Sequence, residues 1–203
     1  TYPAQVVFCA RPFAGLADLA GRRVRTSSVG QSELVQALGG IPVVTPFAEI
    51  IAAFRAGVVE CAITGTLSGH EIVIYEVTSH VHAMALTWGI SIFGANGIAW
   101  AALPPDIQAI MRTGVTELEQ EIWAAADRET GEGLACNAGN ANCATGRRGL
   151  MTVVPVTSAD DDRRRRLLTE VVLPRWVSRC GPDCVDAWNE RLAPVFGIQA
   201  KSE

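Results

Sequence analysis

The sequence predicts an α/β fold with one long connecting helix. Short apolar segments rich in β-branched residues alternate with amphipathic segments of helical period between residues 22 and 63. A helix start at Leu103-Pro-Pro-Asp106 then opens an apolar pattern of helical spacing that continues to about Gly131. Of the 203 residues, 49% are hydrophobic and 19% charged, so the chain has enough apolar side chains to bury a core.

Caps and turns set the order of the elements. Ser27-Ser28 cap a short helix that Gly39-Gly40 end, and Thr45-Pro46 start a second helix that ends at Gly57. The expected strands are residues 5–10, 22–26, 41–44, 58–63 and 151–156, with a strand-rich segment at 80–91. The expected helices are residues 32–38, 46–57, 71–77 and 104–131, and a last helix that opens at 160–166. Residues 22–63 therefore form a β-α-β-α-β series, which predicts a parallel sheet covered by helices.

The sequence predicts the local structure of two segments in the C-terminal third of the chain. Residues 136–143 predict a hairpin-like insertion after the long helix. Residues 160–166, Asp-Asp-Asp-Arg-Arg-Arg-Arg, place aspartates at the positive end of a helix dipole and predict a solvated helix face.

Charge and hydropathy exclude two classes of protein. The formal net charge is −4 and the chain has no long basic block, so the surface needed to bind a phosphate backbone is missing. The longest apolar run, Met84 to Ala102, contains glycine, asparagine and hydroxyl side chains, which would make a poor membrane helix. We expect neither a nucleic-acid partner nor a membrane-embedded protein.

Six cysteines indicate an oxidising compartment. They are Cys9, Cys61, Cys136, Cys143, Cys180 and Cys184. Cys136 and Cys143 flank a turn rich in Gly and Asn. Cys180 and Cys184 flank Gly-Pro-Asp. Each turn can bring the Cα atoms of its two cysteines within disulfide range. Cys9 and Cys61 remain, and we expect them to form a third, long-range pair. The alternative for the last four is a thiolate zinc site, although the six-residue gap in the first pair is wide for zinc.

The segment at residues 18–25, Asp-Leu-Ala-Gly-Arg-Arg-Val-Arg, predicts a turn and then a strand with Arg25 on its buried side. A helix N-terminus follows at Thr26-Ser-Ser, and Arg11 lies upstream beside Pro12. A guanidinium group stays charged and presents paired donors in a plane, which suits a carboxylate. These arginines near a helix N-terminus indicate anion recognition, with an ordinary structural ion pair as the alternative role of Arg25.

Three further residues are candidates for ligand contact. Thr64 and Thr66 lie in a polar loop that follows a buried strand, where ligands of open α/β sheets bind. Their hydroxyls are candidate donors, although loop threonines also bond to their own backbone. Trp88 is a candidate for stacking on the apolar part of a ligand, with a place in the core as the alternative.

Five motifs occur in an order and spacing that resemble the periplasmic solute receptors of tripartite ATP-independent periplasmic (TRAP) transporters, of the dicarboxylate-receptor type. They are residues 18–25, residues 44–49 (Val-Thr-Pro-Phe-Ala-Glu), residues 56–60 (Ala-Gly-Val-Val-Glu), residues 75–77 (Tyr-Glu-Val) and residues 102–106 (Ala-Leu-Pro-Pro-Asp). The resemblance spans roughly residues 5 to 200.

The resemblance implies a fold and a function. It implies a periplasmic-binding-protein-like fold of type II, with two α/β lobes joined by crossing strands and a long helix that close over an organic acid. The carboxylate-clamping arginine of the family falls on Arg25, and a second family arginine falls on Arg11. The expected partners are the acid and the TRAP membrane permease, the expected location is the periplasm, and no cofactor is implied. Better known members have an acidic-Asn-Pro turn where this chain has Ile63-Thr-Gly-Thr66.

The resemblance also implies a domain division. Family members are longer, and most of their first lobe precedes the segment that residues 2–11 resemble. We therefore expect residues 9–90 and 132–203 to form the second lobe, and residues 91–131 to form the inter-lobe strand and spine helix. The first lobe is then largely absent from this chain.

Two other functions remain open. In a periplasmic metal-dependent hydrolase, His80 and His82 would present two imidazoles on one face of a strand, with Glu71 and Glu76 nearby in sequence. The sequence contains no matching third ligand and no G-x-S-x-G, phosphate-loop or H-E-x-x-H motif. The other alternative is an extracytoplasmic sensor domain of the same fold.

Overall fold

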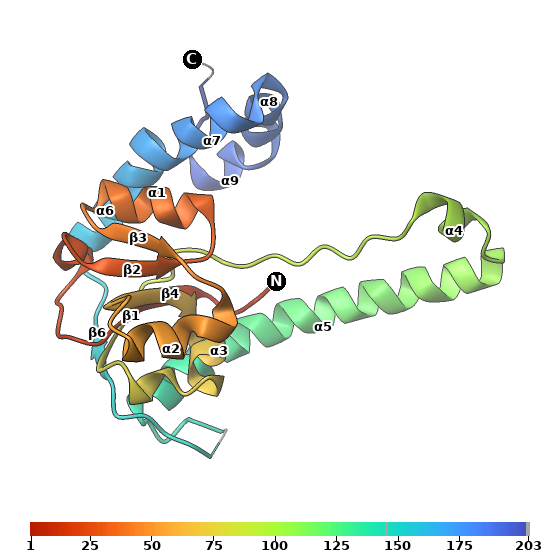
Figure 1. The fold of residues 1–203 in the computed structure, drawn as a ribbon. Helices are drawn as coiled ribbons and strands as arrows, with labels where there is room; N and C mark the ends of the chain where they lie inside the picture. Colours follow the sequence, from red (N-terminus) through yellow and green to blue (C-terminus); the bar gives the residue numbers. More distant parts are fainter. Residues whose placement is uncertain (145, 202–203) are drawn as a thin grey trace.

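The computed structural model describes residues 1–144 and 146–201. Within these residues the chain forms a six-stranded mixed sheet with helices on both faces (Figure 1). The strand order is β3-β2-β4-β1-β5-β6. The strands are β1 (Gln5–Cys9), β2 (Arg23–Thr26), β3 (Ile41–Val44), β4 (Cys61–Gly65), β5 (His80–His82) and β6 (Thr152–Val154).

The parallel half of the sheet confirms the predicted β-α-β-α-β series. Strand β2 pairs in parallel with both β3 and β4, and the two connecting segments carry α1 (Val29–Ala37) and α2 (Ile50–Arg55). Ser28 accepts a hydrogen bond from the backbone N–H of Gln31, as its predicted capping role requires. Strand β1 instead pairs antiparallel with β4 and β5, and β5 pairs in parallel with β6.

Alternate residues of each strand enter two cores, one on either face of the sheet. Val7 packs in the core on the face covered by α1 (Leu34 and Val35). Val6 and Phe8 pack in the other core, together with Ile50 and Phe54 of α2. The other helices are α3 (Thr66–Glu71), α4 (Gly97–Ala101), α5 (Pro105–Ala138), α6 (Ser158–Leu167), α7 (Leu173–Cys180), α8 (Pro182–Arg191) and α9 (Ala193–Phe196).

Helix α5 packs against the sheet domain only at its C-terminal end. There it approaches α3 so closely that a Cβ at Gly133 would overlap the backbone of Thr66 and Leu67. Figure 1 shows α4 and the N-terminal part of α5 extending away from the sheet, alongside the extended segment that follows β5. We call residues 89–125 the arm. Its large apolar side chains are exposed; among them are Ile92, Phe93, Ile98, Ile110 and Trp123.

Several predicted boundaries were wrong. The long helix continues past residue 131 to Ala138 and ends at Gly139, whose φ of 78° favours glycine. Cys136 therefore lies in the last turn of α5 and not in a hairpin-like insertion. The predicted helix at 71–77 is replaced by α3, which starts earlier, and by a 3₁₀ turn at Ile74–Glu76. The strand-rich segment at 80–91 is a strand only over His80–His82.

Three disulfides join Cys9 to Cys61, Cys136 to Cys143, and Cys180 to Cys184, as predicted. The first links residues that lie directly opposite each other on β1 and β4. Because these sulfurs are paired, the alternative of a four-thiolate zinc site is wrong for this structure. No helix among the described residues is both long enough and apolar enough to cross a membrane.

Candidate functional site

Arg25 lies near the carboxyl end of β2, opposite Val43 of β3 and Ala62 of β4. Its side chain shares the sheet face of Ala62, which belongs to the core beneath α2. The residue is only 4% exposed. Its Nε donates a hydrogen bond of 2.8 Å to the carbonyl of Thr45, and its Nη1 donates one of 2.9 Å to the carbonyl of Ile63.

Arg25 makes no ion pair with a carboxylate in the part of the chain that the structure describes. Burial lowers the pKa of its guanidinium, which still leaves the group protonated because arginine titrates far above neutral pH. A buried charge normally has an ionic partner, since its desolvation is costly. The site therefore holds a positive charge with two neutral carbonyl acceptors and no counter-ion among the described residues.

Thr64 lies on the same face of the sheet, two residues beyond Ala62 on β4. It is 3% exposed, and its methyl group lies against α3 at Gly69. Its hydroxyl has no hydrogen-bond partner among the described residues. Arg25, Thr64 and the start of α3 meet at the carboxyl ends of β2 and β4, where open α/β sheets bind ligands. The structure thus places Arg25 and Thr64 on one face of the sheet, near the same end.

The other predicted ligand residues lie elsewhere. The hydroxyl of Thr66 donates to the carbonyl of Glu129 at 3.3 Å, so it connects α3 to α5. Trp88, which is 55% exposed, lines a cavity beneath α1 on the opposite face of the sheet from Arg25. Arg11 lies at the amino end of β4, where its side chain is exposed and forms an ion pair with Glu60.

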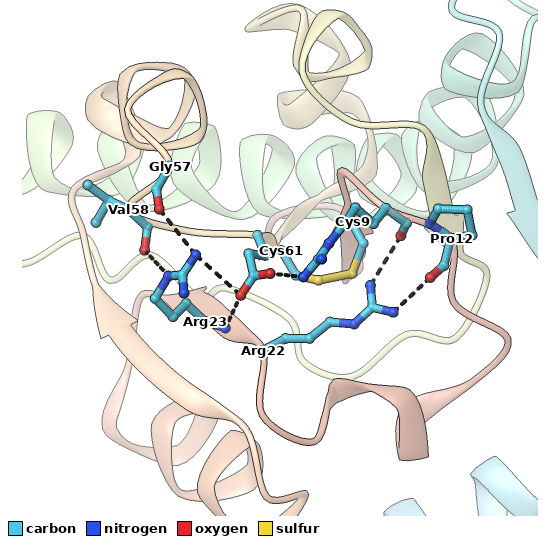
Figure 2. Close-up of polar contacts among 9 residues, drawn as sticks. Cys9, Pro12, Arg22, Arg23, Gly57, Val58 and Cys61 are labelled. Atoms are coloured by element: carbon cyan, nitrogen blue, oxygen red, sulfur yellow. Dashed lines mark hydrogen bonds and ion pairs between the residues drawn. A yellow bond between two sulfur atoms is a disulfide. The ribbon is translucent and has the colours of Figure 1, made fainter.

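Figure 2 shows this amino end of the sheet, where each arginine is held by groups of the chain itself. Arg22 donates to the carbonyls of Arg11 and Pro12, at 3.1 and 2.7 Å. Arg23 donates to the carbonyls of Val58 and Gly57 and pairs with Glu60 at 3.4 Å. The backbone N–H of Arg23, followed by the charges of Arg23 and Arg11, lowers the pKa of Glu60.

His80 and His82 do not form the metal site of the hydrolase alternative in this structure. The buried His82 accepts a hydrogen bond at Nδ1 from the N–H of Met84, and its Nε2 faces Asp160 at 3.4 Å. His80 contacts Ser79 at Nδ1, and the ring of Phe13 packs against both imidazoles. Among the described residues the cluster with metal-ligand spacing is His70, Cys136 and Cys143, in which both sulfurs belong to a disulfide.

Asp160 departs from the solvated helix face expected at residues 160–166. It is 5% exposed and accepts hydrogen bonds from the N–H of Leu16, at 2.8 Å, and from the hydroxyl of Thr157. These bonds keep its pKa below the usual value although burial opposes that shift. Sequence reasoning missed this role because Leu16 is 144 residues away.

The model of a protein family, bacterial extracellular solute-binding protein, family 7, matches residues 4–135 of this chain. No curated protein matches the sequence.

Solved structures of solute-binding proteins resemble the chain. A TRAP periplasmic solute binding protein from Desulfovibrio salexigens with bound orotic acid has a TM-score of 0.75 at 20% identity, covering 95% of this chain and 60% of that one. A Bordetella pertussis extracytoplasmic solute receptor binding pyroglutamic acid has a TM-score of 0.71 at 22% identity, with coverage of 93% and 60%. A TRAP periplasmic solute binding protein from Shewanella oneidensis with bound succinate has a TM-score of 0.64 at 17% identity, with coverage of 91% and 58%.

The likeness confirms the predicted periplasmic-binding-protein-like fold with its long helix. The chain spans about 60% of the length of the first two of these structures.

Proposed function

Because the chain belongs to the bacterial extracellular solute-binding protein family 7, we propose that it is the acid-binding part of a TRAP solute receptor. In this proposal it binds a small organic acid outside the cytoplasm, in the periplasm, and the receptor delivers the acid to a TRAP membrane permease. The family supports a binding role over the hydrolase and sensor alternatives. The three disulfides are consistent with an oxidising compartment.

One observation carries the proposal: Arg25 is buried and has no carboxylate partner among the described residues. Its two carbonyl acceptors hold Nε and Nη1 in place, so the guanidinium plane is fixed before a ligand arrives. A ligand carboxylate would supply the missing negative charge through charge-assisted hydrogen bonds. The hydroxyl of Thr64 is our proposed second donor.

The related structures support a carboxylate as the recognised group. Their ligands are orotic acid, pyroglutamic acid and succinate, which share a carboxylate and differ in the rest of the molecule. We accordingly assign the carboxylate to Arg25. Arg11, Thr66 and Trp88 have lesser support as ligand residues at Arg25. Arg11 is paired with Glu60, the hydroxyl of Thr66 donates to the backbone carbonyl of Glu129, and Trp88 lies on the other face of the sheet.

We also propose that residues 9–90 and 132–203 form one lobe and that residues 91–131 connect it to another. The exposed apolar side chains of the arm support this division, because many large apolar side chains exposed on one segment indicate an interaction site.

A thermal-shift screen tests the proposed function. The 203-residue chain and Arg25→Ala are heated with small monocarboxylic, dicarboxylic and aromatic acids at millimolar concentration. A ligand that binds only the folded protein must raise the melting temperature. We expect at least one acid to raise the melting temperature of the parent and not that of Arg25→Ala. An equal rise in both proteins with every acid that stabilises the parent, or no rise with any acid, would contradict the proposal.

A further inference from the structure

A cavity of about 460 Å³ lies between α1, the segment after β5 and the C-terminal helices. Leu34 of α1 lines it and belongs to the core that includes Val24, whereas Arg25 faces the core of Ala62. The cavity and Arg25 are therefore on opposite faces of the sheet. Its size is within the range of small-molecule sites. The walls are mostly apolar and include the aromatic rings of Trp88, Trp188 and Phe196.

Contacts among the helices hold these walls in place without a ligand. The indole N–H of Trp188 donates to the carbonyl of Ile198 at 2.8 Å, and its ring stacks on Phe196 with centroids 6.3 Å apart. Arg179 of α7 forms an ion pair with the mostly buried Glu33 of α1, which joins the two sides of the cavity. A pocket that is already formed loses little entropy when it binds a rigid ring.

Positive charge lines one side of the cavity. Arg164 and Arg165 both line it, and both bind the same carboxylate, Asp161, at 2.6 and 2.9 Å. Asp162 adds a further attraction to Arg165. Two guanidinium groups thus share Asp161, and the buried Nε of Arg164 has no hydrogen-bond partner among the described residues. Since two positive charges share one carboxylate and Asp162 also attracts Arg165, Arg164 is the cation better placed to receive an anion.

The other polar side chains on the wall are uncharged and already form hydrogen bonds with the chain. Gln31 donates through Nε2 to the hydroxyl of Thr87 and to Gln5, and its oxygen accepts from the N–H of Ser27. Ser28 accepts from the backbone N–H of Gln31. The cavity therefore offers one place for a charged group and apolar walls for the remainder of a ligand.

We propose that this cavity is a second ligand site, independent of Arg25, that binds an aromatic monocarboxylate. The ring lies among Trp88, Trp188 and Phe196, and the carboxylate pairs with Arg164. A dicarboxylate is a poor fit, because Arg165 is held by Asp161 and attracted by Asp162, so the second charge would meet mostly apolar walls.

Tryptophan indole N–H signals in an NMR titration of the 203-residue chain with phenylacetate test this site. Trp88 and Trp188 line the cavity, whereas Trp100 and Trp123 lie on the arm. We expect saturable shifts of the Trp88 and Trp188 signals, with the Trp100 and Trp123 signals unchanged. Shifts confined to the arm, or no shift at all, would overturn the proposal.

Three variants sharpen the test. We expect Leu168→Trp, which fills the cavity, and Arg164→Gln to weaken phenylacetate binding about tenfold or more. Because the side chain of Arg164 is partly exposed, we expect Arg164→Gln to fold. This variant therefore still tests the site if Leu168→Trp fails to fold. Arg166→Gln, from the same helix but outside the cavity, is the matched control, with binding within about twofold of the parent.

The same titration separates this site from the one at Arg25. Arg25→Gln should leave the Trp88 and Trp188 shifts intact. If phenylacetate binding is instead lost in Arg25→Gln and kept in Arg164→Gln and Leu168→Trp, the ligand occupies the other site and the proposal is wrong.

Discussion

Arg23 and Arg25 lie two residues apart on one face of β2, and their surroundings differ. The side chain of Arg23 is 44% exposed, donates to the carbonyls of Gly57 and Val58, and pairs with Glu60 (Figure 2). Arg25 is 4% exposed and meets two carbonyls without a carboxylate among the described residues. One strand therefore carries an arginine that Glu60 neutralises and an arginine that no carboxylate of the described residues neutralises.

The difference assigns separate roles to the two ends of the sheet. At the amino end, the Cys9–Cys61 disulfide and the pairs around Glu60 connect β1, β2 and β4 to one another. At the carboxyl end, Arg25 and Thr64 keep donors that the described residues do not use. We therefore propose that the amino end is organised for stability and the carboxyl end for binding.

The largest expected effect concerns the disulfide at the amino end. Replacing Cys9 and Cys61 together by Ala removes a cross-link between residues 52 positions apart. Loop entropy predicts a loss of about 4 kcal/mol in the free energy of unfolding. Urea unfolding measures this loss, and titration with the acid found for the parent should give a dissociation constant within about twofold of the parent value. A loss of binding in the folded variant would show that the two ends are not independent.

A smaller effect is expected when the charge of Arg25 is kept but its geometry is changed. Arg25→Lys retains a cation but loses the planar paired donors that fit a carboxylate. We expect the dissociation constant for the acid to rise about tenfold, which corresponds to about 1.4 kcal/mol. Calorimetric titration measures it, with Arg23→Lys as the matched control from the same strand. Equal affinity of Arg25→Lys and the parent would mean that only the charge matters.

A pH series separates stability from binding. Burial lowers the pKa of His82 in the folded protein. Below the ordinary histidine pKa of about 6.5, the unfolded chain therefore binds a proton at this residue more readily than the folded protein, which favours unfolding. The pKa of Asp160 is also lowered, so its contribution is lost as the pH falls below the ordinary value for aspartate. The free energy of unfolding should therefore decrease as the pH falls from 7 towards 4.

Binding at Arg25 should stay constant between pH 8 and pH 6, because its guanidinium remains protonated throughout. Unfolding in urea and titration with the acid at the same pH values check both statements. If the affinity for the acid instead decreased with pH in parallel with the free energy of unfolding, binding at the carboxyl end of the sheet would not be independent of stability.

The smallest expected effect is at Glu60. Glu60→Gln leaves Arg11 and Arg23 without their carboxylate, but both arginine side chains are well exposed, at 69% and 44%. Solvent screens such pairs, so the free energy of unfolding should fall by less than about 1 kcal/mol, and by less still in high salt. Urea unfolding at two salt concentrations measures this change. A decrease of more than about 2 kcal/mol in the free energy of unfolding would show that the ion pairs of Glu60 behave as a buried network and not as a solvent-screened one.

The part of the fold that depends on local signals was predictable. Ser28 caps its helix and Gly39 follows the end of it, so the β-α-β-α-β series followed from neighbouring residues. The buried position of Arg25 on its strand was predictable in the same way, because its strand and the helix after it are contiguous in sequence. The resemblance to a known receptor family then supplied the carboxylate and the overall fold.

Features that depend on distant contacts were missed. Asp160 looks like a surface residue in a charged run, yet it binds the backbone of Leu16 from the other end of the chain. The cavity is formed by α1 and the C-terminal helices, which are more than a hundred residues apart in sequence. Arg11 was expected to recognise an anion together with Arg25, but the antiparallel pairing of β1 with β4 puts it beside Glu60 at the other end of the sheet.

The most direct test of this account is a calorimetric titration of the parent, Arg25→Gln and Arg23→Gln with the acid identified by the thermal-shift screen. Loss of two charge-assisted hydrogen bonds predicts a dissociation constant about 100-fold higher for Arg25→Gln. Arg23→Gln should bind within about twofold of the parent, because its donors are used by Glu60 and by backbone carbonyls. Equal weakening of both variants, or a parent-like affinity of Arg25→Gln, would contradict the claim that Arg25 is the charge kept for the ligand.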